Sequence, residues 1–186
     1  MALSRLSELQ ELIEIYEKEI EPYKFMYKLQ FGIEITLEIK KEEVCHLIFG
    51  TLTNKNIPNS SFYKGKKGYN KIKSGEIIEV PYQLRKTFKS KSKAFKVLGK
   101  LLTRPKAIMF NKKIVKKGNI GTTDIDANFL FFRDIDGVAA HLFLTYIKNE
   151  REQRYVAKSC LHNIDNTYKK DQIELKIVEI DKVLKS

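Results

Sequence analysis

The stretch from Asn128 to His162 constrains the fold of this chain most strongly. It contains three apolar, β-prone runs, at residues 129–132, 138–147 and 155–161. Only Asp134-Ile135-Asp136-Gly137 separates the first run from the second. Asp-Gly between two such runs is a strong hairpin signal, because both residues tolerate the positive φ that a tight turn requires. The sequence therefore predicts an antiparallel hairpin that continues into a third strand.

A fourth run, residues 173–180, alternates between apolar residues and charged residues, as a half-buried strand does. The C-terminal part thus predicts an antiparallel meander of about four strands. We expect an α+β fold in which helices pack on this C-terminal antiparallel β-sheet. With 186 residues, the chain is long enough to bury a core. We assign residues 1–24 to an N-terminal acidic helix and residues 25–186 to one α+β domain.

Upstream of the meander, the pattern predicts helices and two strand segments. Residues 4–23 carry apolar residues every three or four positions, with Ser4 as a candidate N-cap and glutamates between them. This acidic helix is predicted to be a packing element or a docking arm. Residues 25–31 and 33–39 alternate around Gly32, which predicts one long bent strand or two strands with a bulge. Further helices are expected at 42–50, 69–74 and 82–102, and a strand at 107–110.

The net charge of +12 is concentrated in one third of the chain. Segment 55–117 contains nineteen Lys and Arg residues but only Glu76 and Glu79 as acids, whereas the remainder has a net negative charge. A polyanionic partner is the physical expectation, with nucleic acid, and RNA in particular, ahead of a membrane surface. The alternative is a solvated Lys-rich face.

Aromatic residues Phe62, Tyr63 and Tyr69 are interleaved with the lysines of this segment, as in many single-strand binding sites. They are equally suited to anchor a loop. The helix at 82–102 is expected to bury its leucines and phenylalanines and to turn its lysines, Lys91 among them, to solvent. The candidate nucleic-acid-binding residues are Lys64, Lys66, Lys67, Lys71, Lys73, Arg85, Lys89 and Lys93.

The sequence contains no cofactor motif and no paired metal-binding motif. Cys45, His46, Cys160 and His162 could nominally make a Cys₂His₂ zinc site, but adjacent residues such as Cys45 and His46 rarely chelate one ion together. We therefore expect no metal and no cofactor. No apolar run approaches the roughly 18–20 residues of a membrane span, and no secretion signal is recognisable, so a cytoplasmic protein with reduced thiols is predicted.

Without a metal or a cofactor, a catalytic site would have to use acid–base chemistry by side chains, and histidine is the side chain suited to it near neutral pH. The chain has three histidines. His141 lies within the predicted strand 138–147, where a buried core residue is the expected role. His162 ends the strand 155–161, where a side chain can reach a cleft. His46 follows Cys45 in an apolar segment, and it is either a buried histidine bonded to the backbone or a functional one.

Several short motifs resemble the phage-associated branch of the Barnase/EndoU/colicin/RelE-like (BECR) nuclease superfamily, in particular its fourth phage-derived group. One is a strand followed by a His-Leu-x-x-Gly box at His46–Gly50. Others are Phe62-Tyr63 and a Tyr-x-x-Ile-x-x-Gly helix at residues 69–75. The C-terminal part also fits, with residues 155–161 followed by Asn166-Thr167-Tyr168 and Gln172 before a last strand.

The resemblance implies metal-independent endoribonuclease activity in a protein of phage or mobile-element origin. RNA would be cleaved by attack of its own 2′-OH. The implied candidate site residues are His46, Lys158, Ser159, Tyr168 and Gln172, and His162 is added from its place at a strand end. The alternative is a binding protein on the same fold without catalysis, for example a mobile-element inhibitor of a host nucleoprotein. With either function, a protein partner or antitoxin is expected to dock through the N-terminal helix.

Overall fold

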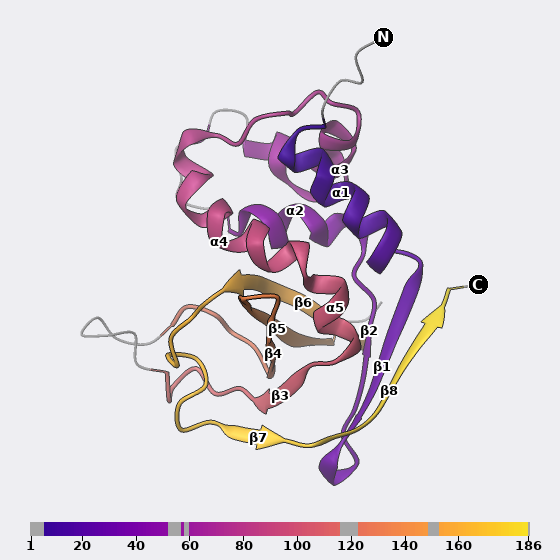
Figure 1. Ribbon diagram of the computed structural model, residues 1–186, viewed down its shortest axis with the longest axis vertical. Helices are drawn as coiled ribbons and strands as arrows, with labels where there is room; N and C mark the ends of the chain where they lie inside the picture. The colour runs from indigo at the N-terminus through magenta and orange to yellow at the C-terminus, as the bar shows by residue number, and fades with distance from the viewer. Residues whose placement is uncertain (1–5, 52–56, 58–59, 116–122, 149–152, 186) are drawn as a thin grey trace.

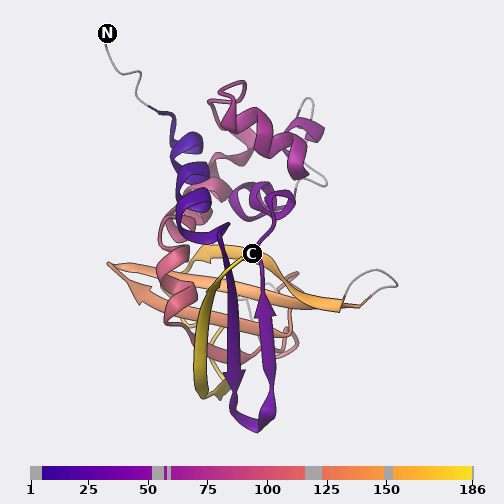
Figure 2. The same ribbon diagram turned by 90° about the vertical axis from the view of Figure 1, so that its right-hand side faces the viewer.

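The computed structural model in Figure 1 describes residues 6–51, 57, 60–115, 123–148 and 153–185. The strands in these ranges are β1 (Tyr23–Leu29), β2 (Glu34–Leu37), β3 (Lys106–Met109), β4 (Phe129–Ile135), β5 (Val138–Lys148), β6 (Gln153–His162), β7 (Ile173–Leu175) and β8 (Ile177–Leu184). The α-helices are α1 (Glu8–Ile15), α2 (Lys41–Phe49), α3 (Gly65–Lys73), α4 (Arg85–Lys96) and α5 (Leu98–Thr103). The helices gather at one end of the molecule in Figure 2, and the β1–β2 hairpin projects from the other end.

The described strands form one mixed sheet of eight, in the order β7-β3-β4-β5-β6-β2-β1-β8. Neighbouring strands are antiparallel except β2 and β6, which run parallel where Leu37 lies beside Tyr155. Lys176 alone separates β7 from β8, and these two strands occupy the two ends of the strand order. The C-terminal segment therefore runs from one edge of the sheet to the other, so that the sheet is nearly closed and barrel-like.

The predicted architecture, helices packed on a C-terminal antiparallel sheet, is therefore wrong. The protein has both helices and strands, but its sheet is mixed and draws strands from both ends of the chain. β1 pairs with β8 over most of its length, and β2 joins the sheet beside β6. Such pairings between distant segments leave no local pattern, because strand periodicity reports which face is apolar and not which strand is the neighbour.

The hairpin predicted around Gly137 is confirmed. β4 and β5 pair antiparallel in register from Phe129–Leu144 to Ile135–Val138. Asp136 and Gly137 occupy the turn with φ of 52° and 77°. Two consecutive positive φ values define the tight turn that matches the twist of a hairpin.

We expect Gly137→Val to lower the free energy of unfolding by about 1–3 kcal/mol, because a β-branched residue is strained at positive φ. No atom lies within 4 Å of a Cβ built at this glycine, so the cost is purely conformational. Gly137→Asn is the matched control, since asparagine tolerates the left-handed region. Urea unfolding of both variants measures the difference, and equal stabilities would contradict the strain argument.

The N-terminal helix belongs to the main hydrophobic core. Ser7 caps α1 by accepting a hydrogen bond from the Gln10 backbone N–H, whereas the predicted cap Ser4 lies outside the described residues. The helix continues as a π-helical turn over Tyr16–Ile20. Its buried residues join the core that also contains β1, β2, α2, α4 and α5. The apolar stripe of the helix is therefore buried, while Glu17 accepts hydrogen bonds from Tyr69 and Lys73.

The chain around Gly32 forms a hairpin rather than a bent strand or a bulge. β1 and β2 pair antiparallel, with Lys28 opposite Glu34. Phe31 and Gly32 both have positive φ, at 63° and 71°, and reverse the chain within the short turn Gln30–Gly32. A single glycine is sufficient because Phe31 also adopts the left-handed conformation there.

The predicted helix at 82–102 is broken at Val97 into α4 and α5. Val97 has φ −110° and ψ 8°, outside helical values, and α4 ends before it. α4 packs against β6 and β5 through Phe88, Phe95 and their neighbours. Lys91 lies on this packed face and is only 6% exposed, so its predicted solvent exposure is wrong.

Candidate functional site

The edge of β6 that faces the helices is where polar side chains gather. Among the described residues β2 pairs with β6 only at Tyr155, so the outward backbone groups beyond it need other partners. Side chains provide them at every second residue, as strand geometry requires. His46 Nε2 lies 2.9 Å from the Lys158 carbonyl oxygen, and Lys91 Nζ donates to the Cys160 carbonyl at 3.2 Å. Ser90 Oγ bonds both the carbonyl and the N–H of His162.

Lys158 is the extra residue of a β-bulge. The β5–β6 register passes from Phe143–Ser159 to Leu144–Ala157 and skips Lys158. A bulge bends the strand and leaves its extra residue out of the ladder, and such positions often re-aim a side chain near a functional site. The Lys158 side chain is exposed, while its carbonyl is held by His46.

His46, Lys91 and Lys158 lie at a pocket of about 180 Å³. It is lined by His46, Gly50, Thr51, Thr87, Lys91, Asp124, Ile125, Lys158 and Ser159. Lys91 reaches it from α4, and its Nζ donates to Ser159 Oγ at 2.9 Å. The pocket therefore combines an imidazole, two cationic side chains, three hydroxyls and the carboxylate of Asp124. The two lysines outweigh the single carboxylate, and this set is suited to an anion such as a phosphate.

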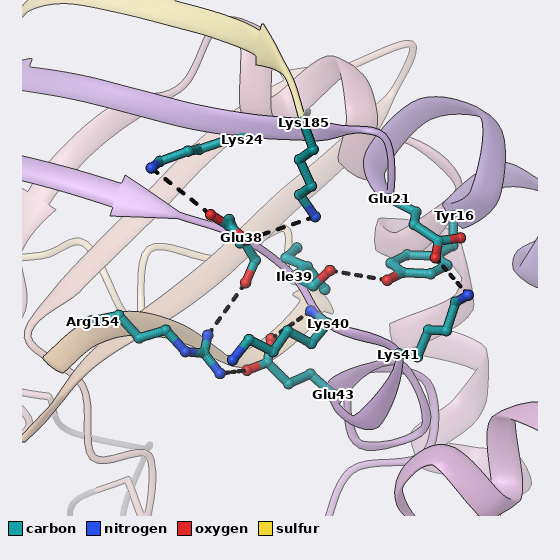
Figure 3. Close-up of polar contacts among 10 residues, drawn as sticks. All are labelled: Tyr16, Glu21, Lys24, Glu38, Ile39, Lys40, Lys41, Glu43, Arg154 and Lys185. Carbon is teal, nitrogen blue, oxygen red and sulfur yellow. Dashed lines mark hydrogen bonds and ion pairs between the residues drawn. The ribbon is translucent and has the colours of Figure 1, made fainter. Parts of the chain in front are cut away.

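Helix α2, which carries His46, is tied to β6 at its N-terminal end. Figure 3 shows Arg154 of β6 donating to the Glu38 carbonyl at 3.3 Å and to Glu43 Oε1 at 2.7 Å. Tyr16 of the N-terminal helix donates its hydroxyl hydrogen to the Ile39 carbonyl at 3.0 Å in the same view. The connection between β2 and α2 is thus held from two sides, and the helix presents His46 to the bulge.

Gly50 has a specific role at the C-terminal end of α2. Its φ is 78°, and a Cβ built on it would lie 2.9 Å from Lys91 Cε. Both the left-handed backbone and the close passage of the lysine stem favour glycine here. The His-Leu-x-x-Gly box thus places the imidazole and the space for Lys91 on one helix end.

The environment of His46 favours its neutral form. Burial lowers the pKa of His46 below its usual value, and the positive charges of Lys91 and Lys158 lower it further. A neutral imidazole whose Nε2–H donates to the Lys158 carbonyl keeps its lone pair on Nδ1. His46 is therefore prepared to accept a proton. The thiols differ, because burial raises the pKa of both Cys45 and Cys160 to about 12, which makes them poor nucleophiles.

The structure brings together three of the predicted catalytic residues, namely His46, Lys158 and Ser159, and places the others elsewhere. Tyr168 is buried in a second, smaller core, with its ring 5.2 Å from that of Phe143. Gln172 bonds the backbone of Asn111 through both amide atoms. The backbone of His162 is held by Ser90, and its side chain does not line the pocket.

Sequence reasoning missed Lys91 and Asp124 as pocket residues. Lys91 follows Phe88 by three residues and precedes Phe95 by four, so helical spacing puts it on the buried face of α4. That spacing was the available signal. No comparable pattern marks Asp124, which reaches the pocket from the irregular segment before β4.

The predicted nucleic-acid contacts lie on α3 and α4 and just before them, and they differ in their partners. Lys71 pairs with Glu76, and Lys73 pairs with Glu17 at 2.6 Å. Lys67 lies 4.8 Å over the Phe62 ring, and Arg85 Nε contacts the Val80 carbonyl. The remaining side chains, which are exposed and have no side-chain partner among the described residues, are Lys64, Lys66, Lys89 and Lys93. Lys55, Lys116 and Lys117, at the ends of the basic segment, lie outside the described residues.

These observations define an α+β protein with a barrel-like mixed sheet and a small cationic pocket at one strand edge. No family model matches the chain, and no curated protein and no solved structure shows significant similarity to it. Within the described ranges no helix is long and apolar enough to cross a membrane. In the same part of the chain, no three His, Cys, Asp or Glu side chains form a metal-binding group.

Proposed function

We propose that this protein is a metal-independent endoribonuclease whose site is the pocket around His46. The supporting observation is the convergence of His46 with Lys158 and Ser159, which follow it by more than a hundred residues of sequence, on one pocket. These are three of the five residues that the resemblance to the BECR nucleases marks as functional, and the other two, Tyr168 and Gln172, lie outside the pocket. The buried Lys91 adds a cation to the same pocket.

The chemistry uses the RNA's own 2′-OH as the nucleophile. Neutral His46 accepts the proton of this hydroxyl through Nδ1, and the 2′-oxygen attacks the adjacent phosphorus. The bond from phosphorus to the 5′-oxygen breaks, and the departing oxygen takes a proton from solvent. Lys91 and Lys158 stabilise the negative charge that develops on the phosphorane, and Ser159 orients a phosphate oxygen. The products are a 2′,3′-cyclic phosphate and a free 5′-OH.

Cleavage of RNA in the presence of excess EDTA tests this proposal directly. We expect the wild-type protein to cut a single-stranded RNA at the same rate with and without the chelator. Loss of cleavage in EDTA that is restored by a divalent cation would exclude the mechanism proposed here.

The exposed lysines of α3 and α4 would hold the RNA backbone. The logarithm of the binding constant should fall linearly with the logarithm of salt concentration, because each phosphate contact releases a counterion. We expect the double variant Lys89→Ala, Lys93→Ala to reduce this slope by about 1.4, since one single-strand contact contributes about 0.7. Lys18→Ala is the control, because Lys18 is exposed on the acidic helix. A slope equal to that of the wild type would show that Lys89 and Lys93 of α4 do not contact the RNA backbone.

A second candidate function is nucleic-acid or partner binding without catalysis. It is favoured by the backbone bonds of His46 and Lys91, because these bonds give both residues a structural role at the β6 edge. Such a protein could inhibit a host nucleoprotein, with α1 as a docking element. It would bind RNA and leave it intact. In either case we propose a cytoplasmic location, where RNA is present and where the buried free thiols stay reduced.

A further inference from the structure

A second cavity lies over β3, β4 and β5, outside the His46 pocket. It has a volume of about 300 Å³, within the range of small-molecule sites. Cross-strand neighbours form its floor, because Lys106 lies opposite Phe132 and Phe132 lies opposite His141. Directly opposed residues share one face of a sheet. Lys106, Phe132 and His141 therefore form a row that points into the same cavity.

His141 contributes an unused hydrogen-bond acceptor to this cavity. It is 1% exposed, and its Nδ1 lies 3.2 Å from the Ala139 carbonyl oxygen, to which it donates. Its Nε2 is then an acceptor, and among the described residues no group bonds to it. A buried polar atom without a partner is costly and calls for a ligand or water. A ligand that offers an N–H here would satisfy it.

Cations and apolar surface complete the cavity. The Lys169 Nζ lies 5.4 Å over the Phe132 ring, and the Phe132 and His141 rings are stacked with an angle of 20° between them. Ile164 lines the rim and is 80% exposed. Arg133 and Asp134 also line it, and the Arg133 guanidinium donates to the Arg104 carbonyl. The site thus offers an aromatic surface, two lysines, the Arg133 guanidinium, the Asp134 carboxylate and the Nε2 acceptor of His141.

We propose that this cavity binds a single nucleotide. The base lies against Phe132 and Ile164 and donates an N–H to His141 Nε2, while the phosphate contacts Lys106 and Lys169. An aromatic face with adjacent cations is the arrangement that holds an unstacked nucleotide in many single-strand binding proteins. The ligand is either a free nucleotide or one unit of an RNA chain. The inference stands independently of cleavage at His46.

Calorimetric titration with the four ribonucleoside 5′-monophosphates and with inorganic phosphate tests the site. None of these probes can be cleaved by 2′-OH attack on an internucleotide phosphate, so failure of the proposed nuclease function does not affect the result. We expect at least one nucleotide to bind about tenfold more tightly than phosphate. The double variant Lys106→Ala, Lys169→Ala should weaken that binding by about tenfold or more. Lys170→Ala, an exposed neighbour that does not line the cavity, should not change it.

His141→Leu should weaken nucleotide binding by about fivefold and leave phosphate binding unchanged, because it removes only the acceptor. If that variant does not fold, the difference in nucleotide affinity between the Lys106→Ala, Lys169→Ala double variant and Lys170→Ala tests the proposal instead. Titration with a short 2′-O-methyl oligonucleotide distinguishes a free nucleotide from one unit of an RNA chain as the ligand. If the oligonucleotide binds and loses affinity in the double lysine variant while no monophosphate binds, the ligand is a unit of RNA. The inference is wrong if phosphate binds as tightly as every nucleotide, or if neither monophosphates nor the oligonucleotide respond to the double lysine variant.

Discussion

Replacing His46 with glutamine should lower the rate of RNA cleavage by about 10²–10⁴-fold, the range for loss of an acid–base group. Glutamine can still donate an N–H to the Lys158 carbonyl, so it preserves the contact that joins α2 to β6. It cannot accept a proton at neutral pH. His162→Gln is the matched control and should retain the wild-type rate, because the His162 side chain does not line the pocket.

The two variants should be assayed at saturating RNA, with the free energy of unfolding measured in urea. The pH profile of the wild type adds a second test. Because the pKa of His46 lies below its usual value, the rate should be on its plateau at neutral pH and should fall only in more acidic solution. Equal cleavage rates for wild type and His46→Gln would show that His46 is not the general base.

Acid should destabilise the fold strongly, and His141 should account for a large part of the loss. Burial lowers the pKa of His141 to about 4, whereas the unfolded chain titrates near the ordinary value of about 6.5. The unfolded state therefore takes up this proton at higher pH than the folded state. Stability from neutral His141 is complete above about pH 6.5 and disappears as the pH falls towards 4, a loss of about 3 kcal/mol.

Urea unfolding of wild type and His141→Leu at pH 7 and pH 4 measures this contribution. The difference in unfolding free energy between the two pH values should shrink by about 3 kcal/mol in the variant, since leucine does not titrate. His46 contributes in the same direction and remains in both proteins, so the comparison isolates His141. An unchanged pH dependence would show that other groups cause the acid sensitivity.

Local elements are predictable from the sequence where a periodic apolar pattern ends at a residue that favours a turn or a helix end. The Asp136-Gly137 turn and the end of α2 at Gly50 are examples, because positive φ at both places favours the residues present. The strand order of the whole sheet could not be predicted from the sequence. The parallel contact of Leu37 with Tyr155 and the pairing of β1 with β8 join segments far apart in the chain. Nothing in the periodicity of one strand specifies its partner.

The candidate site is also only partly predictable, because short local motifs mark some of its residues and not others. His46, Lys158 and Ser159 were expected from short motifs, and the structure brings them together at one strand edge. Tyr168 was expected beside them, but its ring fills a core next to Phe143, as an aromatic residue often does. Lys91 was assigned to the solvent face because of its charge, although helical spacing puts it on the packed face of α4. Its charge is satisfied there by Ser159 and the Cys160 carbonyl.

The end groups of the products test the central claim most directly. A short RNA of defined sequence should be incubated with the wild-type protein in excess EDTA and analysed by mass spectrometry, beside the same RNA with one 2′-deoxynucleotide at the cleavage position. We predict fragments that carry a 2′,3′-cyclic phosphate and a 5′-OH, and no cleavage at the deoxynucleotide. Intact RNA, or fragments with a 5′-phosphate and cleavage at the deoxynucleotide, would contradict the account.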